Sequence, residues 1–205
     1  MIICTNPQGS DEWLDDRSGV VTMSELGAVM ANGRGGAPSL TREEYMVKTA
    51  TEILTGRAVK ETYQSFWMKR GNLLEQEARA FYAFQHDQEV TQVGLILVHS
   101  GRAGASVDGL VGDSGLLEIK DPKLTTHVGY LRYGGLAKAY AKQVQGQLWV
   151  TEREWCDLVS YHPDSHKPTL TKRIHRDETQ IKLIRIAVAA FIMELDDLVA
   201  ELKAV

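Results

Sequence analysis

Cysteine is nearly absent from the sequence, because Cys4 and Cys156 are the only two among 205 residues. Two cysteines cannot build a disulfide framework, a four-cysteine zinc site or a four-cysteine iron–sulfur cluster. The chain also has no apolar run of membrane-spanning length, and its first residues lack the basic region and apolar stretch of a secretory signal. We therefore expect a soluble, cytoplasmic protein in a reducing compartment.

Several chemistry-bearing patterns are missing or incomplete as well. No Gly-x-x-x-x-Gly-Lys-Ser/Thr loop is present, which argues against ATP-driven unwinding by this chain. His162 and His166 have a spacing seen in metal sites, but Pro163 opposes a helix there and no third ligand is evident. The segment Gly-Asp-Ser-Gly at 112–115 resembles the nucleophile segment of trypsin-like proteases. Because the disulfides of that class are impossible here, we interpret the segment as a turn between strands.

Size and charge set the next bounds. A chain of 205 residues with 43% hydrophobic content can bury one sizeable core, so we expect residues 1–205 to form a single domain. The 27 acidic residues exceed the 23 basic ones, and the formal net charge is −4. This mild acidity is only a weak argument against a nucleic-acid partner, because DNA responds to local potential and a basic groove can coexist with an acidic exterior.

The order of helix and strand signals indicates an α/β (α+β) fold with a central mixed β-sheet flanked by helices. Ser10 can cap a first helix, Thr22 and Thr41 each begin a capping-box pattern, and Gly56 is a helix terminator. Helices are expected further along the chain at about 61–70, 71–84, 135–150 and 178–203. Short apolar runs predict strands at 93–98, 106–111, 116–120, 156–161 and 169–175. The two candidate mobile loops follow Met30 and span 124–135.

Three charged residues on two predicted strands could carry chemistry. Asp108 and Glu118 lie on neighbouring strands, and alternation places Lys120 on the same face as Glu118. Phosphodiester hydrolysis needs an activated water and oxygen ligands that hold Mg²⁺ against the phosphate. A lysine beside them can orient the water or stabilise the developing charge. We therefore interpret Asp108, Glu118 and Lys120 as the reaction centre of a magnesium-dependent nuclease.

This interpretation makes a geometric demand on the hairpin between the two strands. An odd number of connecting residues, or a bulge, puts Asp108 on the face of Glu118, whereas an even number puts it on the opposite face. We predict an odd number or a bulge. The triplet alone is a weak signal, because Glu201 and Lys203 repeat it in the C-terminal helix and an exposed charge pair on a strand remains the alternative.

At this point the sequence resembles the bacteriophage lambda exonuclease family, a viral recombination branch of the restriction-endonuclease-like nucleases. The resemblance covers residues 8 to 151 in order. It rests on the segments QGSDEWLDDRSGVVTMSE (8–25), GNLLE (71–75), SVDGL (106–110), LEIKDP (117–122) and YAKQVQGQLWVT (140–151). Asp121 departs from the pattern, since many relatives carry cysteine there, but this removes no metal ligand.

The resemblance implies a restriction-endonuclease-like fold and a catalytic site with two Mg²⁺ ions, for which Mn²⁺ can substitute. The ligands would be Asp108, Glu118 and the carbonyl of Ile119, with Lys120 near the nucleophilic water. Glu75 would add a further acidic group from a helix. The alternative for Glu75 is a helix salt bridge with Arg79, four residues on.

A pocket for a terminal 5′-phosphate is also implied by the resemblance. Its residues would be Arg17, Ser24, Ser106 and Gln143, with Tyr140 on the helix face of Gln143. Ser24 lies in the first turn of a predicted helix, whose free N–H groups favour an anion, and Arg17 offers a bidentate fork for phosphate. Helix capping and packing are the alternative for both residues. Arg34, in the glycine-rich loop, could reach into DNA, or it could be an ordinary surface residue.

These features favour a 5′-to-3′ double-strand DNA exonuclease that releases 5′-mononucleotides and leaves a 3′ single strand for recombination by strand annealing. By resemblance, the protein would come from a phage or prophage, form a trimeric ring around DNA and hand its product to a phage single-strand annealing protein. A structure-specific endonuclease of the same superfamily remains a rival, because it could share the metal residues without needing a DNA end. The other rival is a non-catalytic DNA-end-binding protein.

Overall fold

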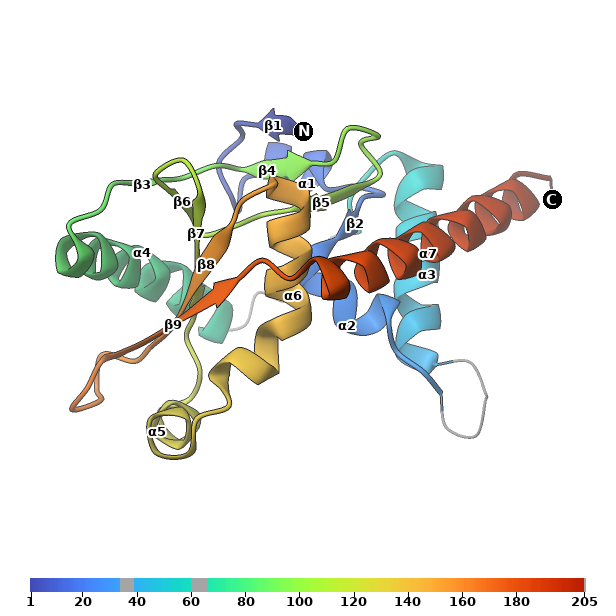
Figure 1. Ribbon diagram of the computed structural model, residues 1–205. Coiled ribbons are helices and arrows are strands. Elements are labelled where there is room, and N and C mark those ends of the chain that lie inside the picture. Colours follow the sequence, from blue (N-terminus) through green and yellow to red (C-terminus); the bar gives the residue numbers. More distant parts are fainter. Residues whose placement is uncertain (34–38, 60–65, 205) are drawn as a thin grey trace.

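The strands of the protein divide between two sheets, as a computed structural model shows (Figure 1). The structure describes residues 1–33, 39–59 and 66–204, with the side chains of 66–72 set aside. Over these residues the larger sheet has the order β3-β6-β7-β8-β9 and the smaller one β1-β4-β5-β2. The predicted α/β class with a mixed sheet and helical cover is confirmed, and the division into two sheets is a feature that the sequence did not indicate.

The larger sheet holds the strands expected to carry chemistry. Its members are β3 (Val90–Thr91), β6 (Gly109–Val111), β7 (Gly115–Lys120), β8 (Trp155–Tyr161) and β9 (Thr169–His175). β7 pairs with β6 in antiparallel fashion and with β8 in parallel, and β8 and β9 are antiparallel. β7 is buried along nearly its whole length, as expected for a strand covered by helices on both faces.

The smaller sheet joins short strands near the N-terminus to short strands near the middle of the chain. It consists of β1 (Ile2–Cys4), β2 (Val21–Thr22), β4 (Leu95–Leu97) and β5 (Ala103–Ala105). Apart from β4, which lies within the expected strand at 93–98, these strands were not predicted. Strands of two or three residues carry too little alternation to be recognised in a sequence.

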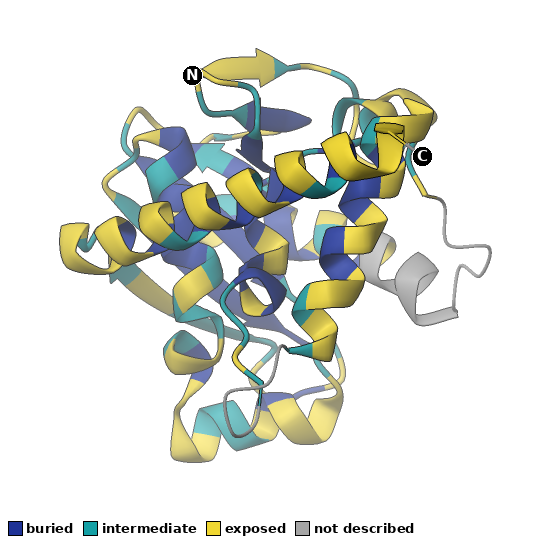
Figure 2. Ribbon diagram, turned by 90° about the vertical axis from the view of Figure 1, so that its right-hand side faces the viewer, coloured by how far each residue is buried: buried dark blue, intermediate teal, exposed yellow. Residues whose placement is uncertain are grey.

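Seven α-helices and one 3₁₀ turn are found among the described residues. They are α1 (Asp11–Asp16), η1 (Met23–Glu25), α2 (Leu26–Val29), α3 (Leu40–Thr55), α4 (Phe66–His86), α5 (Leu124–Tyr133), α6 (Leu136–Thr151) and α7 (Glu178–Ala204). No helix of the described chain is long and apolar enough to cross a membrane. The outer side of α7 is exposed while its inner side is buried (Figure 2).

The helix ends agree with some of the cap predictions and correct others. Ser10 caps α1, with its side chain accepting from the Trp13 N–H, and Gly56 ends α3 in a left-handed conformation. The capping box at Thr41 was wrong by two residues, because Ser39 caps α3 instead. Thr22 precedes a 3₁₀ turn and makes no side-chain cap bond.

The stretch 124–135, interpreted from its sequence as a mobile loop, is largely the helix α5. Its buried His127 explains the difference. One ring nitrogen lies 2.8 Å from the Ser160 hydroxyl and the other 2.9 Å from the carbonyl of Lys167. A carbonyl can only accept, so Nε2 donates to Lys167, and Nδ1 shares a hydrogen bond with the Ser160 hydroxyl. These long-range bonds, which the local sequence does not reveal, fix α5 to β8 and the loop after it.

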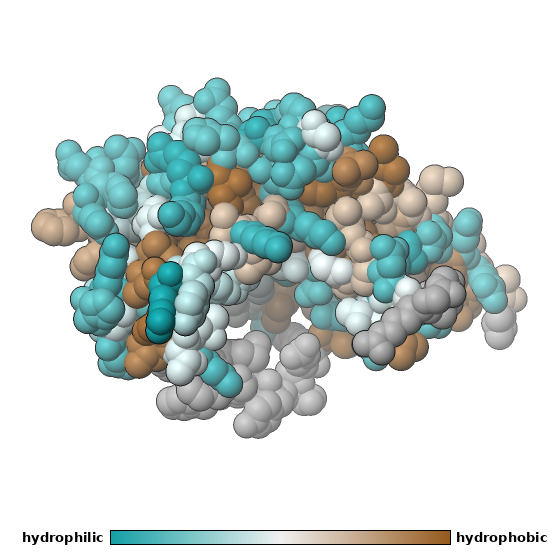
Figure 3. Space-filling view, turned by 60° about the horizontal axis from the view of Figure 1, so that its bottom comes forward, coloured by the Kyte–Doolittle hydropathy of each residue, from teal (hydrophilic) through white to brown (hydrophobic). Residues whose placement is uncertain are grey.

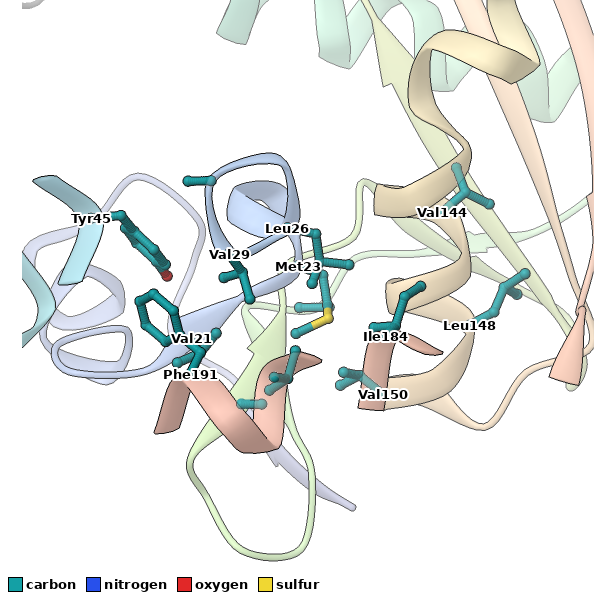
Figure 4. Packing of buried hydrophobic residues seen from close by; sticks show 14 of the residues in the cluster. Val21, Met23, Leu26, Val29, Tyr45, Val144, Leu148, Val150, Ile184 and Phe191 are labelled. Atoms are coloured by element: carbon teal, nitrogen blue, oxygen red, sulfur yellow. The ribbon is translucent and has the colours of Figure 1, made fainter. Parts of the chain in front are cut away.

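The main core lies where the N-terminal helices meet α6 and α7 (Figure 4). Tyr45 of α3 stacks on Phe191 of α7, with ring centroids 5.4 Å apart. Met23 and Leu26 lie against α6 at Gly146, where an added Cβ would stand 2.8 Å from the Met23 sulfur. A second, smaller core packs α4 on the opposite side of β7 and β8. β7 is therefore held between two cores.

One face of the molecule is largely polar. Seen from the side of α5, hydrophilic residues cover much of this face and apolar groups gather between them (Figure 3). Glu201 and Lys203, the second copy of the Glu-x-Lys pattern, are both exposed near the end of α7. Their position confirms that this copy is ordinary solvated surface.

Candidate active site

The turn between β6 and β7 sets the geometry of the site. Val111 pairs with Gly115 and Gly109 with Leu117, so residues 112–114 form a connection with an odd number of residues. Gly112 has φ +51°, a conformation that glycine adopts without strain. Continued by one residue, this register places Asp108 directly opposite Glu118 on one face. The predicted parity of the hairpin is confirmed.

Asp108 turns its carboxylate toward the end of β7. Its Oδ2 accepts a hydrogen bond from the Ile119 N–H at 2.5 Å. A strand residue that is hydrogen-bonded to an antiparallel neighbour directs its N–H and C=O to the same side. The Ile119 carbonyl is therefore directed toward Asp108, beyond the last residue that β6 covers.

Glu118 and Lys120 lie on the α6 face of β7, as the alternation predicted. Lys120 Nζ is 2.7 Å from Glu118 Oε1, and the Glu118 side chain is almost fully buried. Lys120 Nζ also lies 4.9 Å from the centre of the Tyr140 ring. Tyr140 thus contributes a cation–π contact to the lysine that is expected to act near the nucleophilic water.

Two glutamines of α6 hold the Glu118 carboxylate. Gln143 donates to Oε1 and Gln147 to Oε2, each at 2.6 Å. The resemblance placed Gln143 in a phosphate pocket, whereas in this structure its amide lies on Glu118. Gln147 follows Gln143 by one turn of α6 and lies on the same helix face. Its contact with Glu118 could not be read from the sequence, because 29 residues separate the two.

Glu75 and Arg79 of α4 complete the opposite side of the site. Their ion pair is the one expected as the alternative for Glu75. Arg79 also donates from Nε to the backbone carbonyl of Asp108 at 2.7 Å, which ties α4 to the strand that carries Asp108. Of the contacts of Arg79, only the one with Glu75 was predicted. Arg79 is buried, which is unusual for arginine, and this burial distinguishes it from the surface arginines.

The carboxylates of the site repel one another in a buried setting. Burial, followed by the charges of Glu118 and Glu75, raises the pKa of Asp108 well above its usual range. Burial also raises the pKa of Glu75, against the opposing charge of Arg79. Desolvation alone would lower the pKa of Lys120, but its charge and hydrogen-bond interactions with Glu118 outweigh this and raise it. An additional cation among these acids would therefore be favourable.

Arg17 and Trp13 of the N-terminal segment meet at Ser106, which precedes Asp108 by two residues. Arg17 Nη1 and Trp13 Nε1 each donate to the Ser106 hydroxyl at 3.0 Å, and the guanidinium lies 4.5 Å from the Trp13 ring centre. Burial lowers the pKa of Arg17. Of the four residues expected at a phosphate pocket, the structure thus brings Arg17 and Ser106 together. Ser24 bonds with the Thr22 hydroxyl at 3.2 Å, and Arg34 lies outside the described residues.

The residues present fit a magnesium ion by their chemistry. Asp108, Glu118 and the Ile119 carbonyl supply oxygen ligands, which Mg²⁺ prefers. Over residues 1–33, 39–59 and 66–204, no three His, Cys, Asp or Glu side chains form a ready metal-binding group. Glu75, the third acid of the site, is engaged by Arg79.

Comparison with known proteins identifies relatives of the whole fold. The model of the YqaJ-like viral recombinase domain family matches residues 12–154. An alkaline exonuclease from Laribacter hongkongensis is 37% identical in crystal structures with and without dAMP. Those matches cover 95% of this chain and 97% of that one, with TM-scores of 0.86 and 0.84. A phage-related exonuclease from Haemophilus somnus shares the fold at 17% identity, with a TM-score of 0.69 over 89% of this chain and 96% of that one.

A curated relative is considerably longer than this chain. An uncharacterized mimivirus protein, R354 of Acanthamoeba polyphaga mimivirus, is 30% identical over 177 residues, which are 78% of this chain and 30% of that protein. The chain therefore spans less than a third of the length of this relative.

Proposed function

Because the chain belongs to the family of YqaJ-like viral recombinase domains, we propose that it is a Mg²⁺-dependent deoxyribonuclease that degrades double-stranded DNA from an end. Family membership confirms the resemblance to the lambda exonuclease family inferred from the motifs. The proposed reaction is 5′-to-3′ hydrolysis that releases 5′-mononucleotides and leaves a 3′ single strand for annealing. The nuclease domain is proposed to comprise residues 1–205.

The observation that carries this proposal is the convergence of Asp108, Glu118 and Lys120 at one edge of β7. Asp108 reaches the Ile119 N–H, and Lys120 pairs with Glu118. Two acids and a lysine at the end of a buried strand are poorly suited to structural use alone, because buried charges are costly. They suit a site that binds a cation and a phosphodiester.

We propose that Asp108, Glu118 and the Ile119 carbonyl hold two magnesium ions, with Glu75 as a nearby acid. Bound Mg²⁺ lowers the pKa of water and polarises the phosphoryl oxygens. Lys120, held 2.7 Å from Glu118, would orient the attacking water and stabilise the charge that develops on the phosphate. Burial alone would lower the pKa of this lysine, but the charge and hydrogen bond of Glu118 raise it, and this keeps Lys120 protonated.

Recognition of the DNA end is assigned to the Arg17 side. Arg17 lies over the Trp13 ring and donates to Ser106, two residues before Asp108. A guanidinium held in this way can donate two parallel hydrogen bonds to a terminal phosphate. Ser24 and Gln143 remain proposed members of this pocket, and Gln143 would have to exchange its Glu118 bond for one to the phosphate. Arg34 is proposed to contact DNA near the cut.

Two further parts of the proposal come from the family resemblance. The first is a trimeric ring that encircles the duplex, and the second is a single-strand annealing protein that receives the 3′ strand. Both would be present in a bacterial host cell carrying the phage or prophage. Both concern the assembly rather than the site, so the activity test below does not depend on them.

One assay tests the activity. Linear duplex with or without a 5′-phosphate, and closed circular duplex, are incubated with Mg²⁺ or with EDTA. Mononucleotides are expected only from linear DNA with Mg²⁺, and faster from phosphorylated ends. Nicking of the circle would instead indicate an endonuclease, and binding without cleavage would indicate an end-binding protein.

Lys120→Ala is expected to lower the rate of nucleotide release by at least about a hundredfold, the typical effect of removing one charge-stabilising donor. Lys203→Ala is the matched control, because it removes the lysine of the second Glu-x-Lys copy on the exposed end of α7. The control should release nucleotides at the wild-type rate. Equal rates for both variants would refute the assignment of Lys120.

A further inference from the structure

Gln147 holds the deeper of the two oxygens of Glu118. Its Nε2 donates to Oε2 at 2.6 Å, and the two residues are only 1% and 3% exposed. The other oxygen, Oε1, is bonded by Lys120 and Gln143, both of which are partly exposed. The carboxylate therefore has one oxygen on the buried side of α6 and one toward the partly exposed side of the site.

Gln147 is an unfavourable choice if packing were its only role. Its amide oxygen is buried and has no hydrogen-bond partner among the described residues, and leaving a buried acceptor unpaired is costly. Methionine has a similar length and would fill the same space without that cost. The presence of an amide at this position therefore points to a need for its N–H group at Glu118.

We propose that Gln147 is a positioning residue that orients the Glu118 carboxylate for metal binding, an inference that rests on the proposed function. Gln147 fixes Oε2, and Oε1 is then held on the side of Lys120 and Gln143. Hydrogen bonds to a ligating carboxylate are known to set its orientation and its affinity for metal. Gln147 itself does not contact the metal or the DNA.

The same helix offers a matched control. Gln145 is 2% exposed and also a buried glutamine of α6, but both ends of its amide bond to backbone. It donates to the His175 carbonyl at 2.8 Å and accepts from the Asp177 N–H at 2.9 Å. Its removal costs two part-buried hydrogen bonds without touching Glu118.

The test compares Gln147→Met with Gln145→Met in the full chain. Binding of Mn²⁺ without DNA is measured by electron paramagnetic resonance, and the Mg²⁺ concentration for half-maximal nucleotide release is measured separately. Gln147→Met should lower the affinity for Mn²⁺, and raise the Mg²⁺ concentration for half-maximal release, by about ten- to a hundredfold. This is the usual effect of losing a hydrogen bond to a metal ligand. Gln145→Met should lower the thermal midpoint and leave both metal measurements at their wild-type values.

Two outcomes are decisive against the inference. Wild-type Mn²⁺ binding by folded Gln147→Met would overturn it, and so would equal loss of metal affinity in the two variants, since that would be a general effect of α6 damage. If Gln147→Met does not fold by circular dichroism, Gln147→Asn replaces it, because the shorter side chain withdraws the donor and keeps an amide. Failure of the wild-type protein itself to bind Mn²⁺ or release nucleotides would refute the proposed function instead.

Discussion

At the scale of single residues, the site is an acidic cluster with too little compensating charge. Asp108, Glu118 and Glu75 raise one another's energy in a buried setting, and Lys120 and Arg79 each engage one acid. At Asp108, burial and the charges of Glu118 and Glu75 outweigh the Ile119 hydrogen bond and the charge of Lys120, so that its pKa is raised. The ionised form of these carboxylates is therefore disfavoured, and a bound cation would stabilise it, as expected of a metal site.

Arg17 allows a prediction about the DNA end. Arg17→Lys keeps the positive charge but loses the planar fork that can bind phosphate twice. The preference for 5′-phosphorylated over hydroxyl ends should fall about tenfold, because a hydrogen bond to a charged group contributes about 1.5–3 kcal/mol. The ratio of kcat/KM for the two substrates measures this effect.

Arg102→Lys is the control for that experiment. Arg102 is paired with Asp196 on the surface of the protein and is not among the residues proposed to bind phosphate. Its variant should keep the wild-type ratio. An unchanged ratio in Arg17→Lys would remove Arg17 from the phosphate pocket.

At the scale of elements, the position of α6 determines where Gln143, Gln147 and Tyr140 meet β7. Gly146 sets this position, because α6 lies against Met23 and Leu26 with no room for a side chain. The helix α6, which carries Gln143, Gln147 and Tyr140, is thus packed against the N-terminal helices. Those helices are far in sequence from β7, the strand that α6 contacts.

Gly146→Ala should therefore destabilise the protein, because the buried Leu26 and Met23 side chains must shift and overpacking costs about 1–3 kcal/mol, more than the gain in helix propensity of up to about 1 kcal/mol; urea unfolding measures the net change. Gly129→Ala in α5 is the matched control, because an added Cβ there meets nothing within 4 Å. That variant should be neutral or more stable by up to about 1 kcal/mol, the difference in helix propensity. Equal effects of the two substitutions would contradict close packing at Gly146.

A second element-level contact joins β8, β9 and α4. The carboxylate of Asp157 accepts two bonds from Arg173 at 2.8 Å and one from the Tyr82 hydroxyl at 2.7 Å. Burial opposes the charge of Asp157, but the bonds from Arg173 and Tyr82 lower its pKa below the usual 3.8. The lowered pKa belongs to the folded state, so ionised Asp157 stabilises the fold above the ordinary carboxyl pKa. That contribution is lost as the pH falls through the lowered value.

Asp157→Asn should consequently reduce stability by about 2 kcal/mol at neutral pH, the scale of a hydrogen bond to a charged group. The difference from wild type should shrink in acid, below the ordinary carboxyl pKa. Urea unfolding at neutral and strongly acidic pH measures both. A difference that stays constant down to acidic pH would show that the charge of Asp157 does not matter.

The sequence predicted best what depends on neighbouring residues. The odd turn at 112–114, and with it the shared face of Asp108 and Glu118, follows from alternation over a dozen residues. The bonds of Gln147 to Glu118 and of His127 to Ser160 join distant segments, and no local pattern announces them. For the same reason α5 was interpreted as a loop, since three glycines at 129, 134 and 135 obscured a helix held by tertiary bonds.

At the scale of the whole molecule, the proposed ring can be tested directly. A trimer should sediment with three times the 22.8 kDa mass of the chain, and the mass should be independent of DNA. Sedimentation equilibrium over a range of protein concentrations measures it. A chain that remains monomeric at all concentrations would contradict the ring and leave the chemistry of the site unaffected.

The three-residue turn at 112–114 also limits how this protein can change over generations. Arg153 donates to the carbonyls of Gly112 and Gly115, so the turn is anchored to the chain that enters β8. Loss or gain of one residue there would turn Asp108 away from Glu118, whereas a change of two would restore the shared face. Among active descendants, the length of this hairpin should therefore vary by even numbers of residues. Insertions and deletions of an odd number of residues should be lost, whatever their size.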